Sequence, residues 1–180
     1  MRCSHEIWAR AVWATVDTVE HAGLPTAPLF ERVPFDSAGL RRLTRVRWDD
    51  YVEIVESIAR LVGSTGALEN LVEGSHHEVI PEIRALADAF VSPKLLIRYV
   101  FEVLHPILFP PVEFGYTDLG EDRVQLTACL RPGVLPCLPF FEWCVGALRG
   151  MPGHLGLPPA VVAHAKVGPE IGRASCRERV

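Results

Sequence analysis

Apolar residues recur at helical spacing in the segment that follows the aspartates at positions 49 and 50. Glu53 lies three residues after Asp50, which is the spacing of a capping box. The pattern predicts an amphipathic helix that begins at Asp49 or Asp50 and ends at Gly63. Its apolar stripe consists of Tyr51, Ile54, Val55, Ile58, Leu61 and Val62.

Three longer helices are expected elsewhere. The first runs from Ser4 to His21. The second begins with Ser92 as N-cap and Pro93 in the first turn, and it bends or ends at Pro106. The third begins at Pro139. The second and third are apolar around almost their whole circumference, which is typical of buried helices. Shorter helices are expected at 37–43, 65–72 and 81–91.

The pattern then changes to an alternation with a period of two. In the run 123–130 every second residue is apolar, and the run 112–118 precedes it across a short turn that contains Gly120. Two such runs predict a β-hairpin with one buried face. Residues 160–167 resemble a further strand. We therefore expect an α+β fold of N-terminal helices, a β-hairpin, a buried helix and a further strand, with an antiparallel sheet that is truncated in this sequence.

Composition narrows the function classes. The chain has 180 residues, of which 49% are hydrophobic, and a net charge of −4. This composition predicts one packed domain and argues against a protein that binds nucleic acid. No run of about 18 apolar residues predicts a membrane span. The N-terminus lacks the apolar core of a signal peptide, so we expect a cytoplasmic protein.

The last eleven residues, 170–180, read as the translation of a sequencing adapter. We therefore expect one truncated domain at 1–169, an artefact at 170–180, and a natural chain that continues beyond Pro169.

Several stretches resemble an N-terminal sensory module of bacterial signalling proteins such as histidine kinases. They are 22–25, 46–51, 137–141, 146–152 and 155–161. The order of elements is similar to the ligand-binding superfamily of 4-vinyl reductase-like and haem nitric-oxide-binding domains. The resemblance implies a pocket between the sheet and the apolar helices. The haem-binding branch carries a Tyr-x-Ser-x-Arg signature that this sequence lacks, so we expect no cofactor.

No catalytic or metal-binding motif occurs in the sequence. We therefore expect no catalytic residue and no metal site. His105 precedes Pro106 at an expected helix end, which favours a positively charged cap. Cys144 would sense oxidation only if it were exposed and its pKa were lowered.

The expected function is a non-catalytic sensory input domain of a bacterial signal-transduction protein. Its expected partners are a small apolar ligand and an output domain further along the full-length chain, with a homodimer as an open possibility. Two alternatives remain: a scaffold or dimerisation module without a ligand, and a small-molecule enzyme. The candidate pocket wall consists of Tyr99, Val103, Phe140, Phe141, Cys144 and Leu148.

Overall fold

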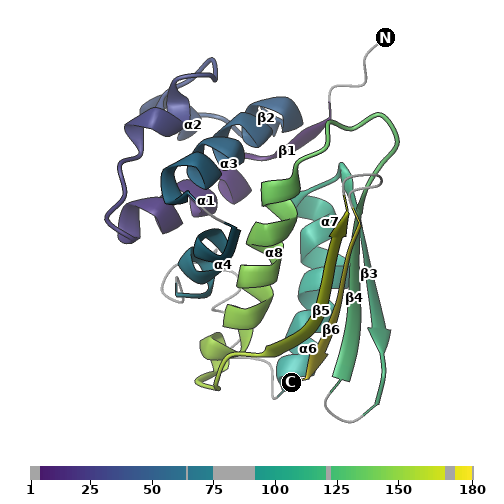
Figure 1. Cartoon of the computed structure of the whole chain (residues 1–180). Coiled ribbons are helices and arrows are strands. Elements are labelled where there is room, and N and C mark those ends of the chain that lie inside the picture. Colours follow the sequence, from purple (N-terminus) through teal and green to yellow (C-terminus); the bar gives the residue numbers. More distant parts are fainter. Residues whose placement is uncertain (1–4, 64, 75–91, 121–122, 169–172, 180) are drawn as a thin grey trace.

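A long helix, α8, stands between a layer of helices and an antiparallel sheet in the computed structural model (Figure 1). The structure describes residues 5–63, 65–74, 92–120, 123–168 and 173–179. The helix expected at 81–91 and the expected start at Ser4 lie outside these residues. The α-helices are α1 (Ala9–His21), α2 (Ser37–Leu40), α3 (Trp48–Val62), α4 (Thr65–Glu73), α6 (Pro93–Tyr99), α7 (His105–Leu108) and α8 (Leu138–Gly150). None of the helices within these residues is long and apolar enough to cross a membrane.

The first helix is shorter than its pattern predicts, because its N-terminal residues form a strand. Strand β1 (Glu6–Trp8) pairs antiparallel with β2 (Arg45–Arg47), and α1 follows directly. A short 3-10 helix, η1 (Ala27–Phe30), lies in the connection between α1 and α2. Helix α3 ends as predicted at Gly63, whose φ of 78° is the left-handed conformation that glycine adopts without strain.

The second buried helix passes through Pro106 without ending there, so of the two predicted outcomes, a bend or an end, the end is excluded. Helix α6 continues into a π-helical turn, η2 (Val100–Leu104), and then into α7. Proline removes an N–H donor and crowds the preceding turn of an α-helix. The wider π turn just before Pro106 accommodates both effects, so the helical run reaches Leu108.

The larger sheet has the strand order β3-β4-β6-β5, and all of its neighbouring strands are antiparallel. Strands β3 (Val112–Asp118) and β4 (Arg123–Leu130) form the predicted hairpin. A 3-10 helix, η3 (Met151–Leu155), leads from α8 to β5 (Val161–Gly168). The mixed architecture confirms the α+β class. Strand β6 (Arg173–Arg179) lies between β4 and β5, within the segment predicted to derive from an adapter, and that origin stays a prediction.

Helices α4 and α8 touch at Gly146. A methyl group at this position would lie 2.9 Å from Cβ of Val72 and 3.0 Å from Cα of Glu69, and still closer to the carbonyl oxygen of Glu69. An ion pair adds to the contact, because Arg149 Nη1 lies 2.6 Å from Glu69 Oε2. The two helices therefore approach to a distance that only glycine allows.

We expect Gly146→Ala to lower the free energy of unfolding by up to about 2 kcal/mol. Overpacking costs about 1–3 kcal/mol, and the higher helix propensity of alanine offsets about 1 kcal/mol of that loss. Urea unfolding at equilibrium measures the change. The matched control is Gly66→Ala in α4, where a new methyl group meets no atom within 4 Å, and it should leave stability unchanged or raised. Equal effects of the two substitutions would show that α4 and α8 are not in close contact.

Candidate functional site

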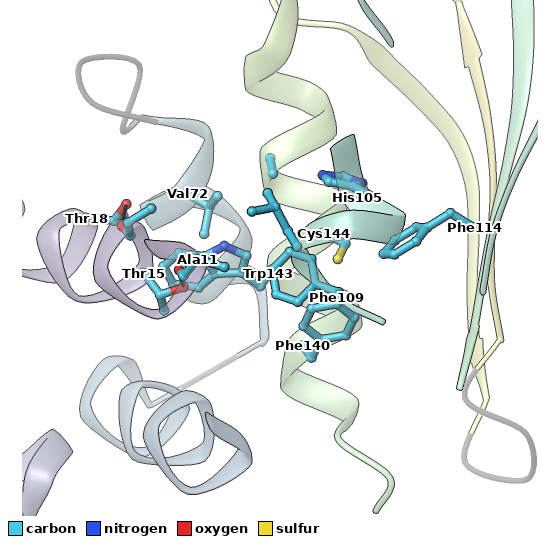
Figure 2. Close-up of a pocket in the computed structure, with 13 residues that line it drawn as sticks. Ala11, Thr15, Thr18, Val72, His105, Phe109, Phe114, Phe140, Trp143 and Cys144 are labelled. Carbon is cyan, nitrogen blue, oxygen red and sulfur yellow. Dashed lines mark hydrogen bonds between the residues drawn. The ribbon is translucent and has the colours of Figure 1, made fainter. Parts of the chain in front are cut away.

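A pocket of about 90 Å³ lies where α1, α4, α7, β3 and α8 meet. Figure 2 shows the side chains of α1 on one side and His105 and Phe114 on the other, with residues of α8 between them. Among the described residues that line it, none is Lys, Arg, Asp or Glu. The members with polar atoms are Thr15, Thr18, His105, Cys144 and Trp143, whose indole N–H is a donor. The apolar members are Ala11, Ala14, Val72, Leu108, Phe109, Phe114, Phe140 and Ala147.

The two threonines in the wall use their hydroxyl protons within α1. Thr15 Oγ1 donates to the carbonyl oxygen of Ala11 at 2.9 Å, and Thr18 Oγ1 donates to that of Ala14 at 2.9 Å. Tyr51 Oη lies 3.2 Å from Thr15 Oγ1 and therefore acts as the donor of that hydrogen bond. Neither threonine retains a proton for a molecule in the pocket.

His105 is the most unusual polar group of the wall. Its ring lies among three phenyl rings, with centroid distances of 4.8 Å to Phe114, 5.0 Å to Phe101 and 6.1 Å to Phe109. Its Nδ1 is buried and has no hydrogen-bond partner. Burial is the cause that lowers the pKa of His105 from 6.5 to about 4. The imidazole is therefore neutral at pH 7, and the predicted positively charged cap is wrong.

His105 and Cys144 are both half-buried, yet burial is the main cause of the shifts in their pKa values. Their accessible surface and their apolar surroundings are compatible because both side chains border the pocket. Burial, and to a lesser extent Cys137, raises the pKa of the Cys144 thiol to about 12. Cys144 is thus a protonated thiol at pH 7, which does not fit a reactive oxidation sensor.

Two of the six residues predicted for the pocket wall, Phe140 and Cys144, line it. Phe141 and Leu148 are buried on other sides of α8, the first in the core of the N-terminal helices and the second in the core beside the sheet. All six keep their ligand-binding role only as a prediction.

Tyr99 and Val103 do not line this pocket, and their place in a ligand-binding wall stays a prediction. Tyr99 is half-buried, and Val103 is 41% exposed. They lie four residues apart, and the spacing continues to Ile107, which is 51% exposed. A helix that is apolar on almost every side gives no sequence signal for the face that turns toward the core.

The sequence pattern missed His105, Phe109 and Phe114, and all of the contribution from α1. The one available signal was His105 itself, a ring with nitrogen atoms in an otherwise apolar stretch of helix. The residues of α1 reach the pocket only through tertiary packing. Within the described part of the chain, no three His, Cys, Asp or Glu side chains are grouped to hold a metal ion.

The neutral His105 predicts a loss of stability in acid. The unfolded chain takes up a proton as the pH falls through 6.5, whereas the folded protein does so only near pH 4. The free energy of unfolding should therefore fall by about 3 kcal/mol between these pH values. His105→Phe should lack this part of the pH dependence in urea unfolding. His21→Gln, at an exposed position of α1, should retain it. A wild-type slope that persists in His105→Phe would contradict the assignment.

Comparison of the sequence with known proteins finds no similar family. No protein-family profile matches it, and no curated protein is similar to it.

Comparison of the structure finds H-NOX domains. A mutant of the Fe(II) unliganded H-NOX protein from K. algicida aligns with a TM-score of 0.66 and 9% identity, over 96% of this chain and 96% of that chain. An oxygen-binding H-NOX domain related to soluble guanylate cyclases aligns with a TM-score of 0.60 and 10% identity, over 94% and 91% of the two chains. The H-NOX from Shewanella woodyi aligns with a TM-score of 0.60 and 13% identity, over 94% and 93%. The chain thus has the fold of H-NOX domains.

Proposed function

We propose that this chain is a non-catalytic sensory domain that binds a small, neutral, mostly apolar molecule in the pocket beside His105. The observation that carries the proposal is a pocket without any charged side chain, lined by rings and small aliphatic groups. Pockets for small molecules are typically apolar with a few placed polar groups. The fold supports the same conclusion, because similar structures are described as an oxygen-binding domain and as a subject of H-NOX activation.

The haem named for a similar structure does not fit this pocket. His105 offers an imidazole of the kind that ligates haem iron. However, a cavity of about 150 Å³ holds no more than a ligand such as benzene, and this pocket has about 90 Å³. Among the described residues, the wall also has no Lys or Arg to pair with the two propionates of a haem. The macrocycle therefore lacks both space and charge partners here, and the proposed ligand is a smaller molecule.

The side chains of the pocket support binding rather than catalysis. Cys144 is protonated, and the hydroxyl protons of Thr15 and Thr18 are donated to the backbone of α1. Nucleophilic catalysis needs an activated nucleophile with a base in hydrogen-bond reach, and these groups do not form such a pair. A scaffold with a filled core would have no space of about 90 Å³ beside α8.

The proposed route of the signal runs through α8. This helix lines the pocket with Phe140, Trp143 and Cys144, and its other contacts include α4 and strand β5. The C-terminal end of α8 is hydrogen-bonded to the residue that precedes β5, because Ala160 N donates to the carbonyl oxygen of Arg149 at 2.9 Å. A ligand that moves α8 would displace β5, and we propose that an output domain of the full-length protein detects that change.

Xenon, a single apolar atom that binds in cavities of this kind, provides a test of the proposed pocket. We expect it to raise the melting temperature, because a molecule that binds only the folded protein stabilises it. Ala147→Leu adds three carbon atoms to the wall and should abolish the increase. The control is Ala38→Leu, which adds the same atoms at an exposed position of α2. No increase in the wild-type protein would overturn the proposed function.

Hemin provides the second arm of this test. We expect no stoichiometric haem complex in an absorbance titration of the wild-type protein. A one-to-one complex with a Soret band that disappears in His105→Phe would show that haem is the ligand and would overturn the haem-free proposal.

A further inference from the structure

We propose that the outward face of the helical run α6–η2–α7 binds a second copy of this chain, so that two such runs pack antiparallel about a two-fold axis. The proposal goes beyond the proposed function and does not depend on it. It follows from the apolar character of this face, from the alignment of its apolar residues, and from the pair of charges beside them.

The face that this run turns to solvent is mostly apolar. The run stands alongside the larger sheet and contacts β3 (Figure 1), and its inner side is buried in the core beside that sheet. On the outer side Leu95, Val103 and Ile107 are 41–51% exposed, and the half-buried Tyr99 lies among them. A helix with one side in a core normally carries polar residues on the other side. Apolar residues that share an exposed face mark an interaction site.

The π turn η2 keeps these four residues, the outer row, in line. On a regular α-helix a spacing of four residues exceeds one turn by about 40°, so three such steps would separate Leu95 from Ile107 by about 120°. The wider turn η2 holds an additional residue, and the step from Tyr99 to Val103 therefore falls short of a full turn. This step cancels part of the drift, which keeps the outer row straight enough to lie against one partner helix.

One pair of opposite charges lies beside the outer row. Arg98 Nε donates to Glu102 Oε2 at 2.8 Å, and both side chains are exposed. They are the only charged residues among the exposed positions of the run Pro93–Leu108, since Lys94 is half-buried and lies 2.6 Å from Asp118. A strongly charged partner would meet one like charge on this face, whereas a second copy offers a counter-charge to each. This self-complementarity is what a two-fold interface requires.

An antiparallel register satisfies the charged and the apolar contacts together. When the two-fold axis lies midway between Arg98 and Glu102 along the run, Arg98 of one protomer faces the partner's Glu102, and symmetry repeats this pair. In the same register Val103 lies midway between the partner's Leu95 and the partner's Tyr99. Side chains that fall into the gaps of the facing row are the arrangement that helix packing favours.

The size of the face predicts a weak dimer. Each partner buries about 800 Å² in a standard interface, and a single helix face is smaller than that. We therefore expect a dissociation constant of roughly 0.1 mM.

Sedimentation velocity of the whole chain between about 10 μM and about 1 mM measures this association. We expect the mean sedimentation coefficient to rise with concentration. Val103→Ser removes apolar surface twice in each dimer and should raise the dissociation constant at least about tenfold. A chain that stays monomeric at about 1 mM would overturn the proposal, and so would an unchanged dissociation constant in Val103→Ser.

Exchange of the charges tests the register. Arg98→Glu and Glu102→Arg each place like charges across the axis, so each variant alone should dimerise about fivefold more weakly. An equimolar mixture of the two variants should associate again, because each acidic copy then faces a basic one. This recovery does not depend on the stability of either variant. A mixture that associates no better than its components would overturn the antiparallel pairing.

The matched control uses another exposed pair with the same spacing. In α3, Arg60 Nη1 lies 3.8 Å from Glu56 Oε2. Arg60→Glu changes the net charge exactly as Arg98→Glu does, and it should leave the dissociation constant unchanged. An equal loss of association in the two variants would show that net charge, and not this face, controls the dimer, and would overturn the proposal.

Discussion

Helix α8 can lie against α4 only because residue 146 has no side chain. The rest of the structure depends on this contact, since α8 contributes buried residues to both hydrophobic cores. Phe140 and Phe141 belong to the core of the N-terminal helices, and Leu148 belongs to the core beside the sheet. A larger residue at position 146 would push the helical layer away from α8, and the pocket wall spans that boundary.

The pocket combines two opposing physical demands. The aromatic rings around His105 exclude water, and that exclusion keeps the imidazole neutral. The same exclusion makes an unpaired nitrogen costly and any hydrogen bond to it more valuable. The site is therefore poorly suited to a charged ligand. The arrangement differs from a catalytic centre, where charged groups and relays normally accompany a titratable residue.

The parts of the fold that follow from local pattern were predictable. The hairpin 112–118 and 123–130 was placed correctly, because alternation along a strand directly reflects one buried face. Helix α3 begins one residue before the predicted Asp49, at the buried Trp48. Strand β1 was assigned to a helix because its pairing with β2 joins segments almost forty residues apart, and local pattern contains no trace of that pairing.

Most of the candidate site was beyond sequence reasoning for the same reason. Phe140 and Cys144 were named from an aromatic helix, whereas Tyr99 and Val103 lie outside the lining of this pocket. The resemblance to haem nitric-oxide-binding domains agrees with the fold of the solved structures, and the resemblance to 4-vinyl reductase-like domains stays a prediction.

The π turn at Val100–Leu104 has a consequence for the evolution of this fold. A π turn amounts to an α-helix that has gained one residue, and such turns are frequent at functional sites. Loss of one residue there would restore a regular α-helix and rotate everything beyond it by about 100°. The buried Leu96 and Ile97 would still anchor the first half, while His105 would turn away from the pocket. A single codon deletion could therefore remove the imidazole from the pocket wall.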